Sequence, residues 1–123
     1  LAMAIEAYRL RKYIGTYSAA LGHVDAVVFT AGAGELSPIL REQVLTGLGN
    51  LGIKIDQKIN AVTRSRSKET QISTPDSPVK VFVVPTDEEM VFVEDVVAIL
   101  EGRYKVHTEY RYAFEAKDYR RKQ

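Results

Sequence analysis

Two glycines, Gly32 and Gly34, follow a short apolar run at residues 25–30, and this segment has the clearest potential for binding chemistry. The run is rich in β-branched and aromatic residues, which predicts a buried strand. Glycines let the backbone turn tightly and approach a ligand without a side-chain clash. Ser37-Pro38 then predicts a helix start, with Ser as the N-cap and Pro in the first helical position. A strand, a glycine turn and a helix start can present backbone N–H groups to a nucleotide or phosphate, although the same pattern also serves a simple chain reversal.

An acidic segment at residues 86–89 is the second candidate for chemistry, and it follows another apolar run at residues 79–84. Thr86 and Glu89 have the spacing of a capping box, in which Thr caps the next helix and Glu bonds back to the Thr N–H. Glu88 has no such task. A carboxylate at this position either only complements the helix dipole or also faces a cation, and the pattern alone leaves both interpretations open.

Basic and imidazole side chains give weaker signals. Arg64, Arg66 and Lys68 alternate with polar residues and would suit a phosphate patch, but a solvated loop is the preferred interpretation of residues 57–71. His23, at a predicted helix end, and His107, on the polar side of a predicted strand, are both interpreted as surface residues.

The periodicity of apolar residues predicts helices that alternate with strands. Helices are expected at residues 2–21, 39–51 and 90–100, and strands at residues 25–30, 79–84 and 104–114, with a very short one at 53–56. This order implies an α/β fold with at least one parallel strand pair and a right-handed crossover. Two buried strands and one edge strand are few for a sheet covered on both faces, so we expect further strands outside this sequence.

Composition sets limits on the function. The chain has 123 residues with 17 basic and 16 acidic side chains, so its net charge of +1 indicates no general attraction to nucleic acid or membranes. It has no cysteine, which excludes a disulfide framework and fits a reducing compartment. No apolar run is long enough to span a bilayer. We expect at most one domain, with no internal boundary, and the helical start suggests a piece of a longer protein.

Several motifs together resemble one family. The segments FTAGAGELSP (residues 29–38), LGIKID (51–56), ISTPDSPVKVFVVPTDEE (72–89) and AYRLRKYIGTYSAAL (7–21) resemble the C-terminal portion of acetate kinases. The family motifs corresponding to the first three read approximately FTAGIGENSP, LGIKID and ISTPDSKVKVFVIPTNEE. The resemblance extends in unbroken order from residue 2 to about residue 100.

This resemblance implies a fold and an activity. Acetate kinases belong to the actin-like phosphotransferases and catalyse Mg-dependent transfer between ATP and acetate, which gives acetyl phosphate and ADP. The implied fold class is α/β, part of an actin-like (RNase H-like) ATPase lobe whose sheet is incomplete without the missing N-terminal part. Residues 1–102 would form a partial nucleotide-binding lobe, and residues 103–123 a C-terminal strand and charged tail. A homodimer in the cytoplasm would be usual for the family.

The resemblance also implies site residues. The nucleotide-binding turn for ATP or ADP would consist of Gly32, Ala33, Gly34, Glu35 and Leu36. Ala33 replaces the usual Ile and Leu36 the usual Asn, so altered affinity or base preference is expected.

By the same resemblance, Glu88 would match an acidic residue that helps to hold Mg. No catalytic residue is expected in this chain, because the groups that act on acetate and the phosphoryl group lie in the missing part. Acetate and acetyl phosphate would bind through that part, and the chain alone would be inactive.

Two alternatives stay open. The chain could be a stand-alone nucleotide-binding module without catalysis, or part of a related propionate or butyrate kinase. A dinucleotide-binding Rossmann motif is excluded because Ser37 stands where its third Gly or Ala is needed, and no Gly-Lys-Ser/Thr of a Walker loop follows the glycines.

Overall fold

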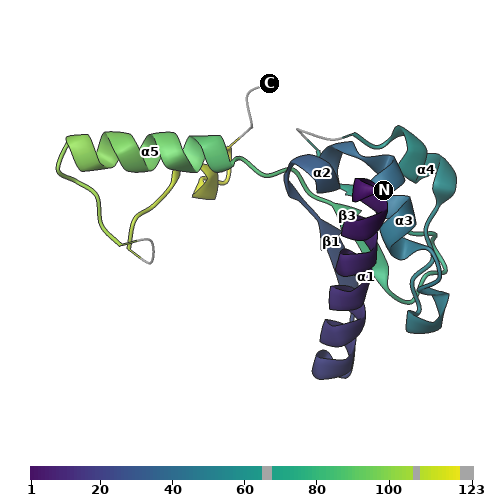
Figure 1. Ribbon diagram of the computed structural model, residues 1–123. Helices are drawn as coiled ribbons and strands as arrows, with labels where there is room; N and C mark the ends of the chain where they lie inside the picture. Colours follow the sequence, from purple (N-terminus) through teal and green to yellow (C-terminus); the bar gives the residue numbers. More distant parts are fainter. Residues whose placement is uncertain (65–67, 107–108, 120–123) are drawn as a thin grey trace. The chain divides into compact units, whose positions relative to one another are not determined.

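The computed structural model describes residues 1–64, 68–106 and 109–119. These residues form two compact units, Leu1–Pro85 and Thr86–Gln123 (Figure 1). No internal boundary was expected here, because the predicted strand at residues 79–84 is followed almost at once by a predicted helix. We describe each unit by itself.

The first unit contains most of the regular structure. Its elements are α1 (Ala2–Leu21), β1 (Ala26–Phe29), α2 (Ala31–Leu36), α3 (Pro38–Leu45), η1 (Gly49–Leu51), α4 (Gln57–Val62), β2 (Thr70–Gln71) and β3 (Lys80–Val83). The predicted long N-terminal helix and the strands at residues 25–30 and 79–84 are confirmed. Gly22 ends α1 with φ 71°, a conformation that glycine adopts without strain.

Three strands form the sheet, in the order β1-β3-β2. β1 is parallel to β3, with Ala26 opposite Lys80 and Phe29 opposite Val83, so the predicted parallel pair is confirmed. β2 is antiparallel to β3. β1 is half-buried rather than buried as predicted, because one of its faces is exposed at Ala26 and Val28 in the described structure.

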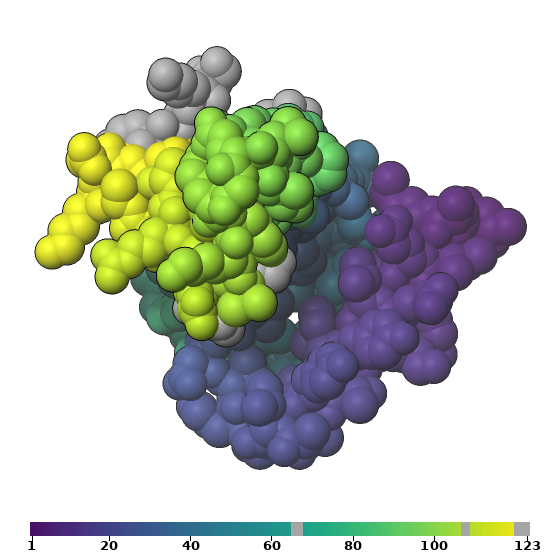
Figure 2. Space-filling view, turned by 90° about the vertical axis from the view of Figure 1, so that its left-hand side faces the viewer, coloured from purple at the N-terminus to yellow at the C-terminus, as the bar shows by residue number. Residues whose placement is uncertain are grey.

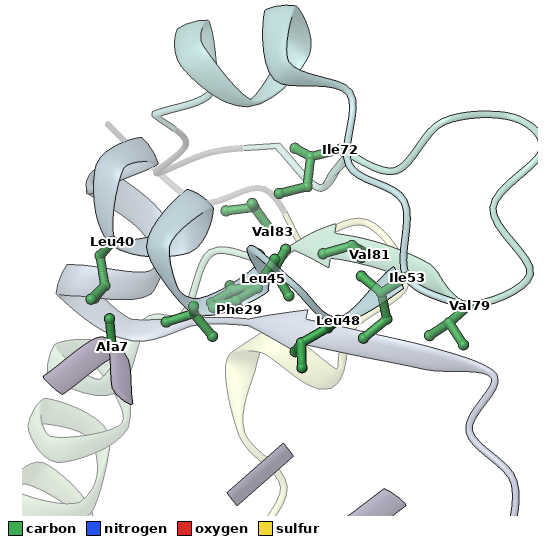
Figure 3. Close-up of a cluster of buried hydrophobic side chains, with 11 residues drawn as sticks. Ala7, Phe29, Leu40, Leu45, Leu48, Ile53, Ile72, Val79, Val81 and Val83 are labelled. Carbon is green, nitrogen blue, oxygen red and sulfur yellow. The ribbon is translucent and has the colours of Figure 1, made fainter. Parts of the chain in front are cut away.

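The core of this unit lies between the sheet and the helices, where side chains from α1, β1, α3 and β3 converge (Figure 3). Its buried residues are Ala7, Phe29, Leu40, Val44, Leu45, Leu48, Ile53, Ile72, Val79, Val81 and Val83. Val81 and Val83 of β3 have no exposed surface. The central strand and α3 therefore carry the packing that holds the segment between β1 and α3 in place.

The predictions for residues 39–71 need correction. The predicted helix at 39–51 ends at Leu45 and is followed by the separate turn η1. The predicted strand at 53–56 is reduced to two isolated bridges. The predicted loop at 57–71 contains α4 and β2, because the Asp56 carboxylate accepts hydrogen bonds from the N–H groups of Lys58 and Ile59 and so caps α4.

The second unit contains α5 (Glu88–Leu100) and η2 (Ala113–Glu115). The predicted helix at 90–100 is confirmed and begins two residues earlier. The predicted strand at 104–114 is wrong, since no strand occurs among the described residues of this segment. Its alternating aromatic rings pack on one another instead: Tyr110 and Tyr112 at 4.8 Å between centroids, and Tyr112 and Phe114 at 5.1 Å.

α1 exposes several large side chains, among them Tyr8, Tyr13, Tyr17 and Leu21, and Figure 2 shows this helix in purple to violet at the surface. Tyr13 and Tyr17 stack with centroids 6.4 Å apart. Across the residues that the structure describes, no helix combines the length and the apolar character needed to cross a membrane.

Candidate functional site

The glycine segment, Gly32–Leu36, lies directly after β1. The predicted tight glycine turn is wrong: Ala31 to Leu36 form the short helix α2. The left-handed residue that turns the chain is Ala31, directly before Gly32, with φ 60°. A non-glycine residue in this left-handed region is uncommon and costs conformational energy. The chain therefore turns at Ala31 and keeps helical geometry through both glycines.

The two glycines have different surroundings. A Cβ atom at Gly34 would lie 3.4 Å from the backbone carbon of Phe29, an ordinary van der Waals contact, so this position faces the end of β1. A Cβ atom at Gly32 would meet nothing within 4 Å. Gly32 and Ala33 are exposed, whereas Glu35 is buried, with 4% of its surface exposed. The exposed residues of the segment are thus Gly32 and Ala33.

Arg41, on α3, holds the end of this segment. It has no exposed surface, and its guanidinium donates to the carbonyls of Gly34 at 2.7 Å and Glu35 at 3.1 Å through Nη1. Nη2 donates to the carbonyls of Asn60 at 3.2 Å and Thr63 at 2.6 Å, and Nε donates to the Asn60 amide oxygen at 2.9 Å. One side chain therefore links the ends of α2 and α4.

Every acceptor of the Arg41 hydrogen bonds named above is an uncharged oxygen, either a backbone carbonyl or the Asn60 amide. Asn60 is 1% exposed and also donates through Nδ2 to the Pro38 carbonyl at 3.0 Å, which ties α4 back to the start of α3. Burial lowers the pKa of Arg41 and the nearby charge of Arg64 lowers it further. Arginine stays protonated in proteins, so the buried charge depends on these carbonyl and amide oxygens.

The position of Arg41 in the sequence indicates that it is buried, although its role was not predicted. Arg41 lies three residues after Pro38 and four before Leu45, on the apolar face of α3, and both neighbours are buried. A charged residue on a core-facing position requires buried partners. Two of those partners, Asn60 and Thr63, come from the 57–71 region, which was predicted as a loop, and the other two are backbone carbonyls of α2, so residue types alone do not indicate what Arg41 contacts.

A cleft of about 470 Å³ lies between α1 and β1 and extends to the glycine segment. Its lining includes Tyr13 and Tyr17 of α1, Phe29 of β1, and Ala33 and Gly34 of α2. The lining is mostly apolar, as is typical of small-molecule sites, and two residues of the glycine segment, Ala33 and Gly34, belong to it.

Glu88 is the first residue of α5, in the second unit, and it is exposed. The predicted capping box is wrong. The helix starts one residue later than the box requires, so Asp87 is the N-cap and Met90, without a carboxylate, occupies the third helical position. Asp87 makes no capping hydrogen bond with its side chain. Glu89 is therefore an exposed first-turn carboxylate like Glu88, and the structure does not separate their roles.

Residues after α5 fold back on its acidic side chains. The Tyr119 hydroxyl donates to the Asp87 carboxylate at 2.9 Å, and the Tyr112 hydroxyl donates to the Asp95 carboxylate at 2.9 Å. The Ala113 N–H donates to both oxygens of Glu94, at 3.1 and 3.0 Å. Burial, and then the bond to Asp95, raises the pKa of Tyr112 to about 12.

No group of three or more metal-ligating side chains occurs within residues 1–64, 68–106 and 109–119. Mg²⁺ is usually held by one or two carboxylates, several waters and substrate phosphates, so a single exposed carboxylate such as that of Glu88 is chemically compatible with this ion.

Of the other charged candidates, those that the structure describes lie at the surface. Arg64 donates to the Ala61 carbonyl at 2.9 Å at the surface, and Arg66 and His107 lie outside the described residues. His23 is exposed and bonds to Asp25 at 3.0 Å, as expected for a surface histidine.

Comparison with known proteins decides the family. Residues 1–94 match the sequence profile of the Acetokinase family. The chain belongs to this family. It is 56% identical over 119 residues to the acetate kinase of Geobacter metallireducens, a match that covers 97% of this chain and 28% of the relative. The chain thus spans little more than a quarter of the length of this curated relative.

Solved structures of the family agree with the fold of this acetokinase-family chain. Acetate kinase from Porphyromonas gingivalis matches with a TM-score of 0.69 and 48% identity, over 81% of this chain and 25% of that one. Propionate kinase from Francisella tularensis matches with a TM-score of 0.59 and 35% identity, over 72% and 22%. The predicted fold class, an α/β part of an actin-like ATPase lobe with a small, incomplete sheet, is confirmed.

Proposed function

We propose that this chain supplies the nucleotide and Mg side of an acetate kinase, which transfers a phosphoryl group between ATP and acetate. The glycine segment, Gly32–Leu36, would contact ATP or ADP, and Glu88 would face Mg²⁺. Residues 1–102 would belong to a partial nucleotide-binding lobe, and residues 103–123 to a charged tail. The observation that carries the proposal is the family's glycine motif beside an apolar cleft: Ala33 and Gly34 line the cleft, and Gly32, next to them, is exposed with open space at its Cβ position.

The two glycines have different environments. The Cβ position of Gly34 lies against Phe29 at ordinary contact distance. At Gly32 no protein atom lies near the missing Cβ position, so packing does not explain why a glycine is present. A ligand that approaches the backbone closely would explain it, since any side chain would stand in its path. Ala33 and Leu36, smaller or less polar than the usual family residues, would tune the affinity.

Glu88 is assigned by its match to the family motif, and its exposure at the first turn of α5 agrees with this role. Phosphoryl transfer depends on positioning and on neutralising phosphate charge, so one metal-side carboxylate is useful only with the groups that hold acetate. Those groups would lie in the remainder of the protein, and the chain alone would be inactive.

A chimaeric enzyme tests the proposal. In it, this chain replaces the matching segment of the Geobacter metallireducens acetate kinase, to which it is 56% identical. Gly32→Val should raise the KM for ATP by about tenfold or more, because a branched side chain would push the ligand away from the backbone. The expected loss of binding free energy is that of at least one hydrogen bond. Gly15→Val is the matched control: Gly15 is also helical with nothing within 4 Å of its Cβ position. Equal KM values for ATP in both variants would contradict the proposal.

The metal assignment is tested in the same enzyme. Glu88→Gln should raise the Mg²⁺ concentration needed for half-maximal activity, and Glu89→Gln should change it less. If Glu89→Gln has the larger effect, the metal-side carboxylate is Glu89.

Propionate is the second candidate acceptor, because propionate kinase from Francisella tularensis is among the structural matches. The acceptor pocket would lie outside this chain, so the longer protein is needed to compare kcat/KM for acetate, propionate and butyrate. We propose acetate first, because the Geobacter metallireducens acetate kinase shares 56% identity with this chain and the Francisella propionate kinase 35%.

A homodimer and a cytoplasmic location complete the proposal, both by resemblance to the family. Sedimentation velocity of the longer protein tests the dimer. The alternative of a stand-alone nucleotide-binding module predicts calorimetric binding of Mg-ATP to this chain by itself, which Glu88→Gln would weaken.

A further inference from the structure

We propose that Arg41 is a positioning residue for nucleotide binding: its guanidinium determines where the glycine segment lies relative to α3 and α4. The inference rests on the proposed function, since it requires that Gly32–Leu36 contact the nucleotide. Arg41 itself is fully buried and would not touch the ligand.

α2 needs support from outside itself. It is six residues long, well below the length at which an isolated helix is stable in water. The last carbonyls of any helix have no partner within the helix. In α2, two of them, from Gly34 and Glu35, accept hydrogen bonds from Nη1 of Arg41 at 2.7 and 3.1 Å. The position of the segment is therefore coupled to the position of this guanidinium.

The guanidinium is itself held on all sides. An arginine side chain has five N–H donors in a planar fork, and the five hydrogen bonds of Arg41 can use each of them. Two go to the Asn60 and Thr63 carbonyls at the end of α4, and one to the Asn60 amide oxygen. Lysine, with a compact ammonium and three donors, cannot reproduce this geometry. Arg41→Lys therefore keeps the charge and removes the fork.

Arg11 offers a matched comparison within the same unit. From α1 it also donates to backbone carbonyls, those of Val44 at 3.2 Å and of Gln43, near the end of α3. Neither of these two acceptors belongs to α2. Both arginines thus bond to carbonyls near helix ends, but Arg41 alone of the two bonds to the glycine segment.

The chimaeric enzyme described above separates positioning from general stability. Arg41→Lys should raise the KM for ATP by about tenfold, the equivalent of one or two lost hydrogen bonds, and leave the KM for acetate within about twofold. Arg11→Lys should leave both KM values unchanged. A general loss of packing would instead lower the amount of active enzyme, and so the apparent kcat, without a selective change in the KM for ATP.

Rescue provides the second readout. In Arg41→Ala, added guanidinium chloride at low, non-denaturing concentration should lower the KM for ATP again, whereas sodium chloride at the same ionic strength should not. If Arg41→Lys does not fold, Asn60→Ala serves in its place. It removes the acceptor of Nε and leaves the carbonyl contacts, so we expect a smaller rise in the KM for ATP.

The outcomes distinguish the two proposals. If Gly32→Val raises the KM for ATP while Arg41→Lys and Asn60→Ala do not, the role of Arg41 is overturned and the proposed function stands. If Gly32→Val itself leaves the KM for ATP unchanged, the proposed function fails, and the inference about Arg41 fails with it.

Discussion

The two segments that carry the proposed site are supported in opposite ways. The glycine segment in the first unit is held from inside by Arg41, which has no exposed surface and bonds to uncharged backbone and amide oxygens. The start of α5 in the second unit is held at the surface, where the Tyr119 hydroxyl bonds to the Asp87 carboxylate. Glu88, beside it, is exposed.

This difference indicates which half of the site is pre-formed. Buried hydrogen bonds to a charged group are strong and are shielded from water, so the glycine segment should be rigid before any ligand arrives. α5 buries one residue, Ala98, and exposes Phe92 and Leu100, at 70% and 81%. A segment with so few buried contacts opens easily. We therefore expect the glycine segment to keep one conformation, whereas the start of α5 adjusts when a ligand binds.

The largest effect on the free energy of unfolding is expected when a buried arginine of the first unit is replaced by methionine, and an exposed arginine of the second unit provides the comparison. Arg41→Met leaves several buried carbonyls without a donor, and each unpaired acceptor costs roughly 1–3 kcal/mol, so we expect a loss of about 3 kcal/mol or more in the free energy of unfolding. Arg103→Met removes an exposed pair with Glu101 and should cost less than about 0.5 kcal/mol. Urea unfolding of the chain measures both. Similar losses for the two variants would remove the contrast between the units.

A smaller effect is expected at the helix that follows the glycine segment. The Ser37 hydroxyl accepts a hydrogen bond from the Leu40 N–H at 3.2 Å and caps α3. Ser37→Ala should lower the free energy of unfolding by about 1 kcal/mol, whereas Ser37→Asp, which can also cap, should restore most of it. Amide exchange would locate the change. If Ser37→Ala increases the exchange rate more in α5 than in α2 and α3, the view that the cap acts within the first unit is contradicted.

The tail contacts of the second unit should be visible at alkaline pH. Burial and the bond to Asp95 raise the pKa of Tyr112 from the usual 10.0 to about 12. Because the folded-state pKa is the higher one, the stability contributed by Tyr112 is fully present below about pH 10 and is lost as the pH rises through about 12. Titration of tyrosinate absorbance should show a late-ionising tyrosine that is lost in Tyr112→Phe. Asp95→Asn should bring its pKa closer to the usual value. An unchanged titration in Asp95→Asn would mean that the tail does not bind α5 as described.

The smallest effect concerns an exposed pair in the first unit. The hydrogen bond from Lys54, 2.8 Å away, is the main cause that lowers the pKa of Asp76 from 3.8 to about 2. The stability contributed by Asp76 is therefore present above about pH 3.8 and is lost as the pH falls through about 2. NMR titration should show the pKa of Asp76 rising in Lys54→Met and at high salt, because exposed pairs are screened. A pKa unaffected by Lys54→Met would assign the shift to another neighbour.

Much of the local structure could be predicted from the sequence. The run Ala26–Phe29 forms a strand, Ser37-Pro38 starts a helix, and Gly22 ends one, each for the expected reason. These features depend on interactions between residues close in the chain, such as a hydroxyl capping an N–H three residues later. The motifs around them were also specific enough to indicate the family, which the comparison confirmed.

Other predictions failed where distant residues decide the outcome. The aromatic alternation at residues 104–114 is typical of a strand, yet Tyr112 bonds to Asp95 and stacks on Phe114, so the rings form their own cluster. The capping box at Thr86 failed by a single residue, because α5 begins at Glu88. A pattern states which residues can pair, but not which competing partner lies nearer in space.

By itself, the sequence determined the order of helices and strands around the glycine segment, and through its motifs the family, because both depend on residue types at short spacing. The tertiary structure alone decided that the segment is a helix rather than a turn, that the Cβ position of Gly34 lies against Phe29 while that of Gly32 is open, and that Arg41 holds the end of α2. Those outcomes require contacts with Phe29, Asn60 and Thr63, and such contacts exist only once the sheet and the helices have packed together.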